Sequence, residues 1–258
     1  IDEELMEWMV RSGMKAFKVG IESGNNAMLK RIKKPTSKRK LMAVSPIFKK
    51  YPEVLCSGNY IIGFPNETFQ EMLDTYELSR ALNWDWASFY LCQPLKGTEM
   101  FSVFENLDDE RIKKENYDKL TNPGRSAVRG EFGMNFDESK DFLARGREIF
   151  DLPRDLVPNL AQQNEIWFAF NFIVNFIENP NFQPGGNVKK IVDWFESIAS
   201  GYPYDASMQA ALAHGYHLMG HEDLFQLHQE QFKKILDMSD YWQRRTREFP
   251  EMLGMAKL

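Results

Sequence analysis

The sequence has few of the residues that build disulfide frameworks and metal sites. Its 258 residues include two cysteines and four histidines, which is too few for a disulfide scaffold or a four-cysteine zinc site. Apolar runs are short, and none reaches the roughly 18 residues that a membrane span needs. We therefore expect a cytoplasmic protein without a membrane span, and we assign no metal ligand to this chain.

An excess of positive charge is also missing. The chain has 32 Lys and Arg against 37 Asp and Glu, a net charge of −5. Proteins that hold nucleic acid by its phosphates usually present a basic face. The one dense basic stretch covers residues 30–40. On this balance we expect no nucleic-acid partner.

The N-terminus has neither an initiator methionine nor the pattern of a signal peptide. The chain begins at Ile1, and Asp2 is placed to cap a helix that starts at once. We therefore expect this chain to be a fragment of a larger protein.

The first hundred residues alternate between strand and helix patterns. Strands are predicted at 16–21, 54–62 and 87–92, with helical spacing of apolar residues between them. Such alternation is typical of a parallel sheet covered by helices. Ligands of these sheets bind at the carboxyl ends of the strands.

Beyond about residue 160 the pattern becomes purely helical. Helices are predicted at 161–178, 187–200, 205–219 and 222–238, and the last two weakly resemble a tetratricopeptide hairpin. The change of pattern predicts three parts: an α/β part at 1–104, a connector at 105–155 and a helical domain at 156–258.

Four short segments carry a family resemblance. They are VGIESG at 19–24, LKRIKK at 29–34, IIGFPNET at 61–68 and PLKGT at 94–98. In this order they resemble the second half of the radical S-adenosylmethionine (SAM) barrel, most closely in the branch with an N-terminal cobalamin-binding domain. The resemblance implies an α/β fold, a partial parallel (β/α) barrel followed by an all-α C-terminal domain.

The resemblance also implies a chemistry. In this family a 4Fe–4S cluster reduces SAM, and the resulting adenosyl radical removes a hydrogen from the substrate; cobalamin serves methyl transfer in some members. We expect SAM and the cluster as cofactors, cobalamin as an optional third, an electron donor, and a small-molecule or lipid-like substrate. The family's Cys-x3-Cys-x2-Cys triad has no counterpart beside Cys56 and Cys92, so the chain alone is expected to be inactive.

Carried over to this sequence, the family pattern assigns three polar SAM contacts. Glu22, at the first strand end, is expected to accept hydrogen bonds from the ribose or the methionyl group. Lys34 is expected to face the SAM carboxylate, and Asn59 to reach the ribose hydroxyls. An amide inside a strand is unusual and, if buried, needs partners.

Three further positions are assigned to the adenine. Ile61 follows Asn59 on the same face of the strand and is expected to pack on the base. Cys92 and Gln93 end the third strand, where backbone atoms would meet the adenine. No catalytic residue is assigned.

Two other functions fit parts of the pattern. Glu22 and Glu67 are candidate acid–base carboxylates of a (β/α)8 hydrolase or isomerase fragment. Alternatively, the chain is a non-catalytic interaction module, in which the helical part binds a protein and the half-barrel is a relic. A cysteine triad upstream of this chain would favour the radical enzyme over both.

Overall fold

The structure is a computed structural model that describes residues 1–113 and 144–258. Three strands, β1 (Ala16–Glu22), β2 (Leu55–Ile62) and β3 (Trp86–Leu91), pair in parallel in the order β1-β2-β3. The prediction of an α/β fold with a parallel sheet is confirmed. The described strands form an open sheet, so the partial barrel stays a prediction.

Helices make up most of the rest of the chain. The first part contains α1 (Glu3–Arg11), α2 (Asn26–Arg31), α3 (Lys38–Phe48), α4 (Phe69–Leu82), α5 (Glu99–Asn106) and the 3-10 turn η1 (Glu110–Ile112). The second contains η2 (Gly146–Asp151), α7 (Leu160–Phe172), the π-helical turn η3 (Ile173–Ile177), η4 (Pro180–Phe182), α8 (Val188–Ala199), α9 (Ala206–Leu218), α10 (Glu222–Met238), α11 (Asp240–Glu248) and α12 (Glu251–Met255).

The four helices predicted in the C-terminal part are all present, within a few residues of their expected bounds, with η3 continuing α7. Sequence patterns missed α11 and α12. Most of the expected connector, 105–155, lies outside the described residues. The division into domains therefore stays a prediction. No described helix is long and apolar enough to cross a membrane.

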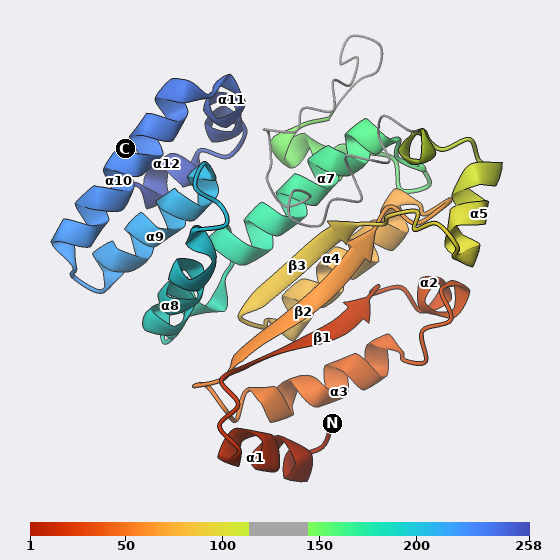
Figure 1. Cartoon of the computed structure of the whole chain (residues 1–258), viewed down its shortest axis with the longest axis horizontal. Coiled ribbons are helices and arrows are strands. Elements are labelled where there is room, and N and C mark those ends of the chain that lie inside the picture. The colour runs from red at the N-terminus through yellow and green to blue at the C-terminus, as the bar shows by residue number, and fades with distance from the viewer. Residues whose placement is uncertain (114–143) are drawn as a thin grey trace.

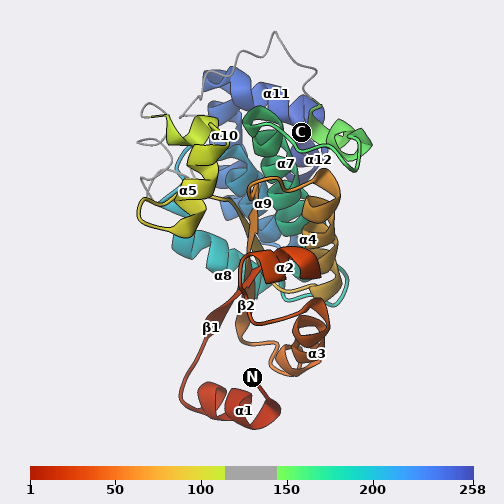
Figure 2. The ribbon, with the colours of Figure 1, turned by 90° about the vertical axis from the view of Figure 1, so that its right-hand side faces the viewer.

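The sheet has two different faces. Figure 2 shows α3 and α4 on one side of the strands and α5 and α8 on the other. Tyr60 and Ile62 of β2 point to the α4 side and are buried in the main core with Met72 and Tyr76. Because side chains alternate along a strand, Asn59 and its neighbours at 57 and 61 point to the opposite, more polar face.

The outer edge of β3 is covered by α7 and η3, which lie along it (Figure 1). Asn175 accepts a hydrogen bond from Ala87 N and donates one to Ala87 O, both at 2.7 Å. Asn171 does the same for Phe89, both at 3.2 Å. Asn179 donates to Asp85 O at 2.9 Å. These side chains satisfy backbone groups that an edge strand otherwise leaves unpaired.

This asparagine ladder depends on a match of two repeats. The three asparagines are four residues apart, which spans about 6 Å along a helix. Their partners are two residues apart, which spans about 6.6 Å along a strand. Each successive asparagine amide therefore lies beside every second residue along β3. This match fixes the register between the helix and the strand.

We predict that Asn175→Leu lowers the free energy of unfolding by about 2–5 kcal/mol. The change leaves the N–H and C=O of Ala87 buried without partners, and each such group costs about 1–3 kcal/mol. Urea denaturation measures the effect. The control is Asn164→Ala on α7, the helix that η3 continues, because Asn164 donates to Leu160 O of its own helix. An Asn175→Leu loss no larger than that of the control would contradict the ladder's role.

Candidate functional site

The carboxyl end of β1 holds the first two expected site residues together. A register irregularity lies between Gly20 and Glu22, and Glu22 has a positive φ of 65°. After α2 the chain returns, and Lys34 Nζ lies 3.0 Å from Glu22 Oε1. Both side chains are partly exposed, at 33% for Lys34 and 22% for Glu22. The pair thus lies at the surface of the strand ends rather than in the core.

Asn59 lies beside this pair in the middle of the sheet. It is aligned with Gly20 of β1 and Ser88 of β3, so the three residues share one face. A Cβ added at Gly20 would lie 2.8 Å from Glu22 Oε1 and 3.2 Å from Lys34 Nζ. Asn59 Oδ1 is buried and has no hydrogen-bond partner in the described part of the chain. This face of the sheet therefore places a carboxylate, an ammonium group and an amide oxygen without a partner around Gly20, which has no side chain.

The three positions assigned to the adenine lie farther along β2 and β3. Ile61 packs against a small apolar cluster that includes Met28, Phe64 and Cys92. Cys92 N donates to Ile62 O at 2.8 Å, and Cys92 O accepts from Arg111 at 3.1 Å, so both backbone groups are already bonded within the chain. Gln93 follows and is half-buried.

Arg111 is a site residue that sequence reasoning missed. Its side chain is buried, and Nη1 donates to Gly63 O at 2.8 Å as well as to Cys92 O. Asp109 holds the guanidinium through two bonds of 2.8 Å. Arg111 therefore ties the loops after β2 and β3 together. In sequence it stands in a charged run that looks solvent-exposed, and no local pattern marks it.

The turn after Glu22 is fixed against α4. Ser23 Oγ lies 3.2 Å from Thr75 Oγ1, which also accepts from Gly24 N at 3.0 Å. A Cβ on Gly24 would lie 2.2 Å from Asp74 O, so only glycine fits this contact. The ESG sequence thus holds the Glu22 end of β1 in place.

Glu67 is fully buried below the turn that ends β2. Its Oε2 accepts from Gly63 N at 2.6 Å and Phe64 N at 3.0 Å, while Oε1 has no partner among the described residues. Burial raises the pKa of Glu67 to about 8. A carboxyl with no exposed surface cannot reach a substrate, which argues against the hydrolase or isomerase with Glu22 and Glu67 as its acid–base pair.

The two cysteines do not form a cluster site. Cys56 lies near the amino end of β2 and Cys92 just beyond the carboxyl end of β3. Burial raises the pKa of both thiols, to about 12 for Cys92. Among residues 1–113 and 144–258 no group of three or more His, Cys, Asp and Glu side chains is placed to hold a metal. The residues present do not fit a 4Fe–4S cluster, which needs converging thiolates.

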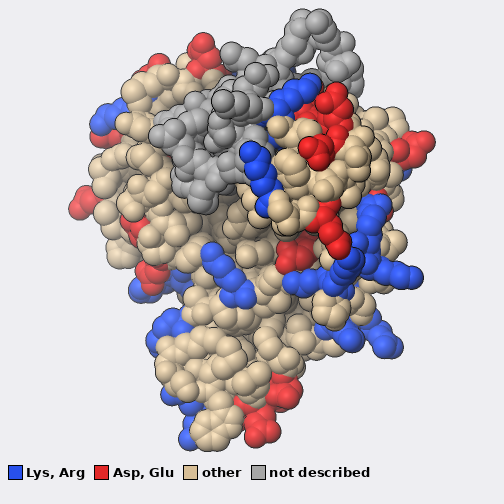
Figure 3. All heavy atoms as spheres, turned by 45° about the vertical axis from the view of Figure 1, so that its right-hand side comes forward, with Lys and Arg blue, Asp and Glu red and all other residues tan. Residues whose placement is uncertain are grey.

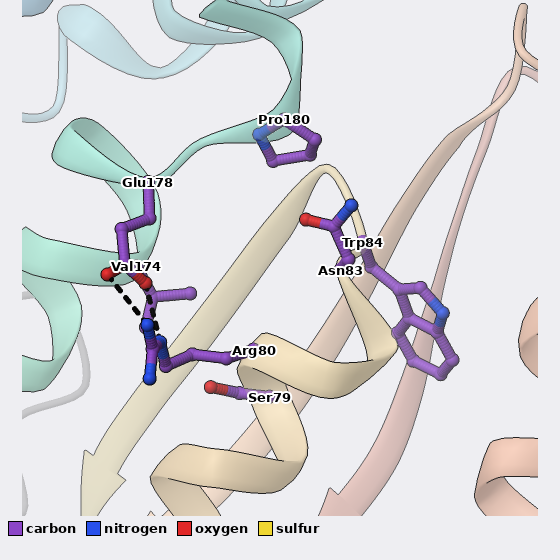
Figure 4. A pocket seen from close by; sticks show the side chains of 7 residues that line it. All are labelled: Ser79, Arg80, Asn83, Trp84, Val174, Glu178 and Pro180. Carbon is purple, nitrogen blue, oxygen red and sulfur yellow. Dashed lines mark hydrogen bonds and ion pairs between the residues drawn. The ribbon is translucent and has the colours of Figure 1, made fainter. Parts of the chain in front are cut away.

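One cavity lies elsewhere, between the end of α4 and the η3–η4 turns (Figure 4). Its volume is about 140 Å³, and its charged lining residues, Arg80 and Glu178, bond each other at 2.6 and 3.0 Å. Trp84, at its rim, precedes β3. The cavity is therefore at the amino end of the strand, away from the Glu22 site, and its charges are already paired.

Comparison with known proteins finds relatives for part of the chain. It is 30% identical over 107 residues to tRNA-2-methylthio-N(6)-dimethylallyladenosine synthase of Fusobacterium nucleatum, covering 41% of this chain and 24% of that enzyme. It is 31% identical over 122 residues to the synthase of the same name from Bacillus cytotoxicus, covering 46% and 24%. The chain thus spans about a quarter of the length of these relatives. No protein-family profile matches it.

These relatives support the resemblance to the radical SAM superfamily, and with it SAM and iron–sulfur chemistry in that family. They give no support to the cobalamin-carrying branch or to cobalamin as a cofactor.

The relatives also overturn the expectation about partners. They act on tRNA, so the exclusion of nucleic acid and the small-molecule or lipid-like substrate are wrong. The error came from using the charge of the whole chain. The first 50 residues carry 12 Lys and Arg against 5 Asp and Glu, although the chain as a whole has a net charge of −5. Phosphate contacts depend on local charge, because salt screens charges more than about 10 Å apart.

We predict that Glu67→Gln removes a pH dependence of stability. Between pH 4.5 and about 8 the folded protein keeps a proton on Glu67 that the unfolded chain releases. The free energy of unfolding of the parent should therefore fall as pH rises through this range. Urea denaturation at pH 5, 6.5 and 8 should show a smaller fall in the variant. Glu53→Gln, which removes an exposed carboxyl, is the control; equal slopes in parent and Glu67→Gln would contradict the prediction.

We also predict that this chain, reconstituted anaerobically with iron and sulfide, takes up no stoichiometric 4Fe–4S cluster. Two buried, protonated thiols at opposite ends of the sheet cannot supply the three thiolates required. Iron and sulfide analysis after desalting, with the absorption spectrum, measures uptake. A cluster absorption band that survives desalting would show the prediction to be wrong.

Proposed function

We propose that this chain forms part of the SAM pocket of a radical SAM enzyme that modifies a tRNA nucleoside. The observation that carries the proposal is the unpartnered, buried Oδ1 of Asn59 beside the Glu22–Lys34 pair. A buried amide oxygen without a partner is costly, and a ligand hydroxyl would satisfy it. The site lies at the carboxyl ends of parallel strands, where ligands of such sheets bind.

Each polar side chain suits a different part of SAM. Glu22 offers a carboxylate to the ribose or the methionyl ammonium, and Lys34 a cation to the methionyl carboxylate. Asn59 would accept a hydrogen bond from a ribose hydroxyl. The charged ends of Glu22 and Lys34 lie over Gly20, because a side chain at that position would come within 2.8 Å of Glu22 Oε1 and 3.2 Å of Lys34 Nζ.

The apolar side chains would exclude water. Ile61 lies two residues beyond Asn59 on the same face and packs on a cluster with Met28 and Phe64. An apolar wall strengthens the neighbouring polar contacts by lowering the local dielectric. When bound and reduced, SAM supplies a carbon radical that removes hydrogen from the substrate. The cluster that reduces SAM would need ligands other than the two cysteines of this chain.

The substrate class comes from the relatives, which are named for a modified adenosine of tRNA. We propose a tRNA nucleoside for this chain as well. The complete protein would also need an electron donor for its cluster. Cobalamin has no place in the proposal.

We predict that Asn59→Leu weakens SAM binding by roughly five- to 150-fold. The change leaves a ligand hydroxyl without an acceptor, which costs about 1–3 kcal/mol, and each 1.4 kcal/mol is a factor of ten. Glu22→Gln should weaken binding less than Glu22→Ala, because the amide keeps an acceptor. Lys34→Arg should be milder than Lys34→Glu, which reverses the charge. Isothermal titration calorimetry of SAM into the complete, cluster-loaded protein measures these affinities.

The matched control is His217→Ala on α9, which should leave the affinity unchanged. Variants Glu22→Ala and Asn59→Leu that both bind SAM like the parent would refute the pocket.

A further inference from the structure

A dense group of positive side chains lies next to the proposed pocket. Seven of the eleven residues from 30 to 40 are Lys or Arg, and none is acidic. Six of them are exposed: Lys30, Arg31, Lys33, Lys38, Arg39 and Lys40. They come from the end of α2, the following loop and the first turn of α3. On the face drawn in Figure 3, Lys and Arg side chains gather in such a patch. We call these six residues the basic patch.

Most of the charge of the patch is not neutralised. Arg31 lies 3.5 Å from Glu71, and Lys33 lies 2.6 Å from Glu99. The other four cations form no ion pair within residues 1–113 and 144–258. The pair between Lys33 and Glu99 joins two exposed side chains, and such pairs hold weakly in water.

The position of three of these cations is unfavourable for the fold. Lys38, Arg39 and Lys40 fill the first turn of α3, which has no acidic residue. The positive end of the helix dipole lies there, and cations at that end destabilise a helix. Local folding therefore does not account for them. An anionic partner over this surface would offset the repulsion.

The seventh cation connects the patch with the site. Lys34 belongs to the same run, and its ammonium is paired with Glu22 at 3.0 Å. A polyanion held by the patch would therefore lie directly beside the pocket. The pocket itself has a carboxylate already neutralised by Lys34, so it does not repel that polyanion.

We propose that the basic patch binds the phosphate backbone of the RNA substrate and so brings a nucleoside to the pocket. This inference rests on the proposed function, and it adds the surface by which the substrate is held. The contacts are to phosphates and are independent of base sequence. The class of ligand is an RNA with a regular phosphate backbone rather than a free nucleoside.

The test is the binding of a fluorescently labelled, unmodified tRNA transcript to the chain, measured by anisotropy between 50 and 200 mM NaCl. The variant is Lys38→Gln/Arg39→Gln/Lys40→Gln. We expect binding at least about tenfold weaker at 50 mM NaCl. We also expect the slope of log K against log salt to become shallower by about two to three, because each lost phosphate contact removes roughly 0.7–0.9 from it.

The matched control is Lys15→Gln/Lys233→Gln/Lys234→Gln. It removes the same charge from exposed lysines outside the patch, and its tRNA affinity and salt slope should stay within about twofold of the parent. Thermal unfolding separates binding from folding. Because the three cations oppose the α3 dipole, their loss should leave the melting temperature unchanged or raise it.

Three results would overturn the proposal. The first is equal tRNA affinity in the two triple variants, and the second is the lack of salt-dependent tRNA binding by the parent. The third is stronger binding of the parent to phosphatidylserine vesicles than to tRNA at equal phosphate concentration. The SAM titrations are independent of these measurements. Failure of the patch with intact SAM binding would leave the proposed pocket standing, whereas loss of both would remove the function as well.

Discussion

The asparagine ladder on β3 is the interaction on which the arrangement of the sheet and the helices depends. Asn171 and Asn175 each donate to and accept from one β3 residue, and all of these groups are buried. Sliding α7 by one residue would leave several of them unpaired in a low dielectric, at a cost of about 1–3 kcal/mol for each group. The ladder therefore sets a single register. With it, Gln163 is placed against Gly63 at the end of β2.

The carboxyl ends of the strands are held by polar groups that are almost completely buried. Arg111 bonds the carbonyls of Gly63 and Cys92, and Glu67 bonds the amides of Gly63 and Phe64. The turn after β2 is thus bonded by a cation on the Gly63 carbonyl and by a carboxyl group on the Gly63 and Phe64 N–H groups. These bonds satisfy the backbone polar groups at the end of β2. Glu22, Lys34 and Asn59 take no part in these bonds.

Sequence patterns predicted the strands and helices, whose formation depends on residues close together in the chain. Apolar spacing identified the three strands and the main helices, and the resemblance placed Glu22 and Lys34 at one site although twelve residues separate them. The partners of Arg111 and Asn175 could not be read from the sequence, because each bonds backbone atoms far along the chain. One signal was present: asparagines repeated every fourth residue in an apolar helix, where amides are disfavoured. The net charge misled because it averages a basic N-terminal region with an acidic remainder.

The Glu22–Lys34 pair explains how an anion-binding surface and a carboxylate can share one edge of the sheet. A lone Glu22 would repel phosphates held by the neighbouring cations, since like charges repel more strongly where the local dielectric is low. Paired at 3.0 Å, the two groups act at a distance as a dipole, whose field decays faster than that of a charge. Glu22 keeps its ability to accept a hydrogen bond at close range. The basic patch therefore keeps its full attraction for a polyanion up to the rim of the pocket.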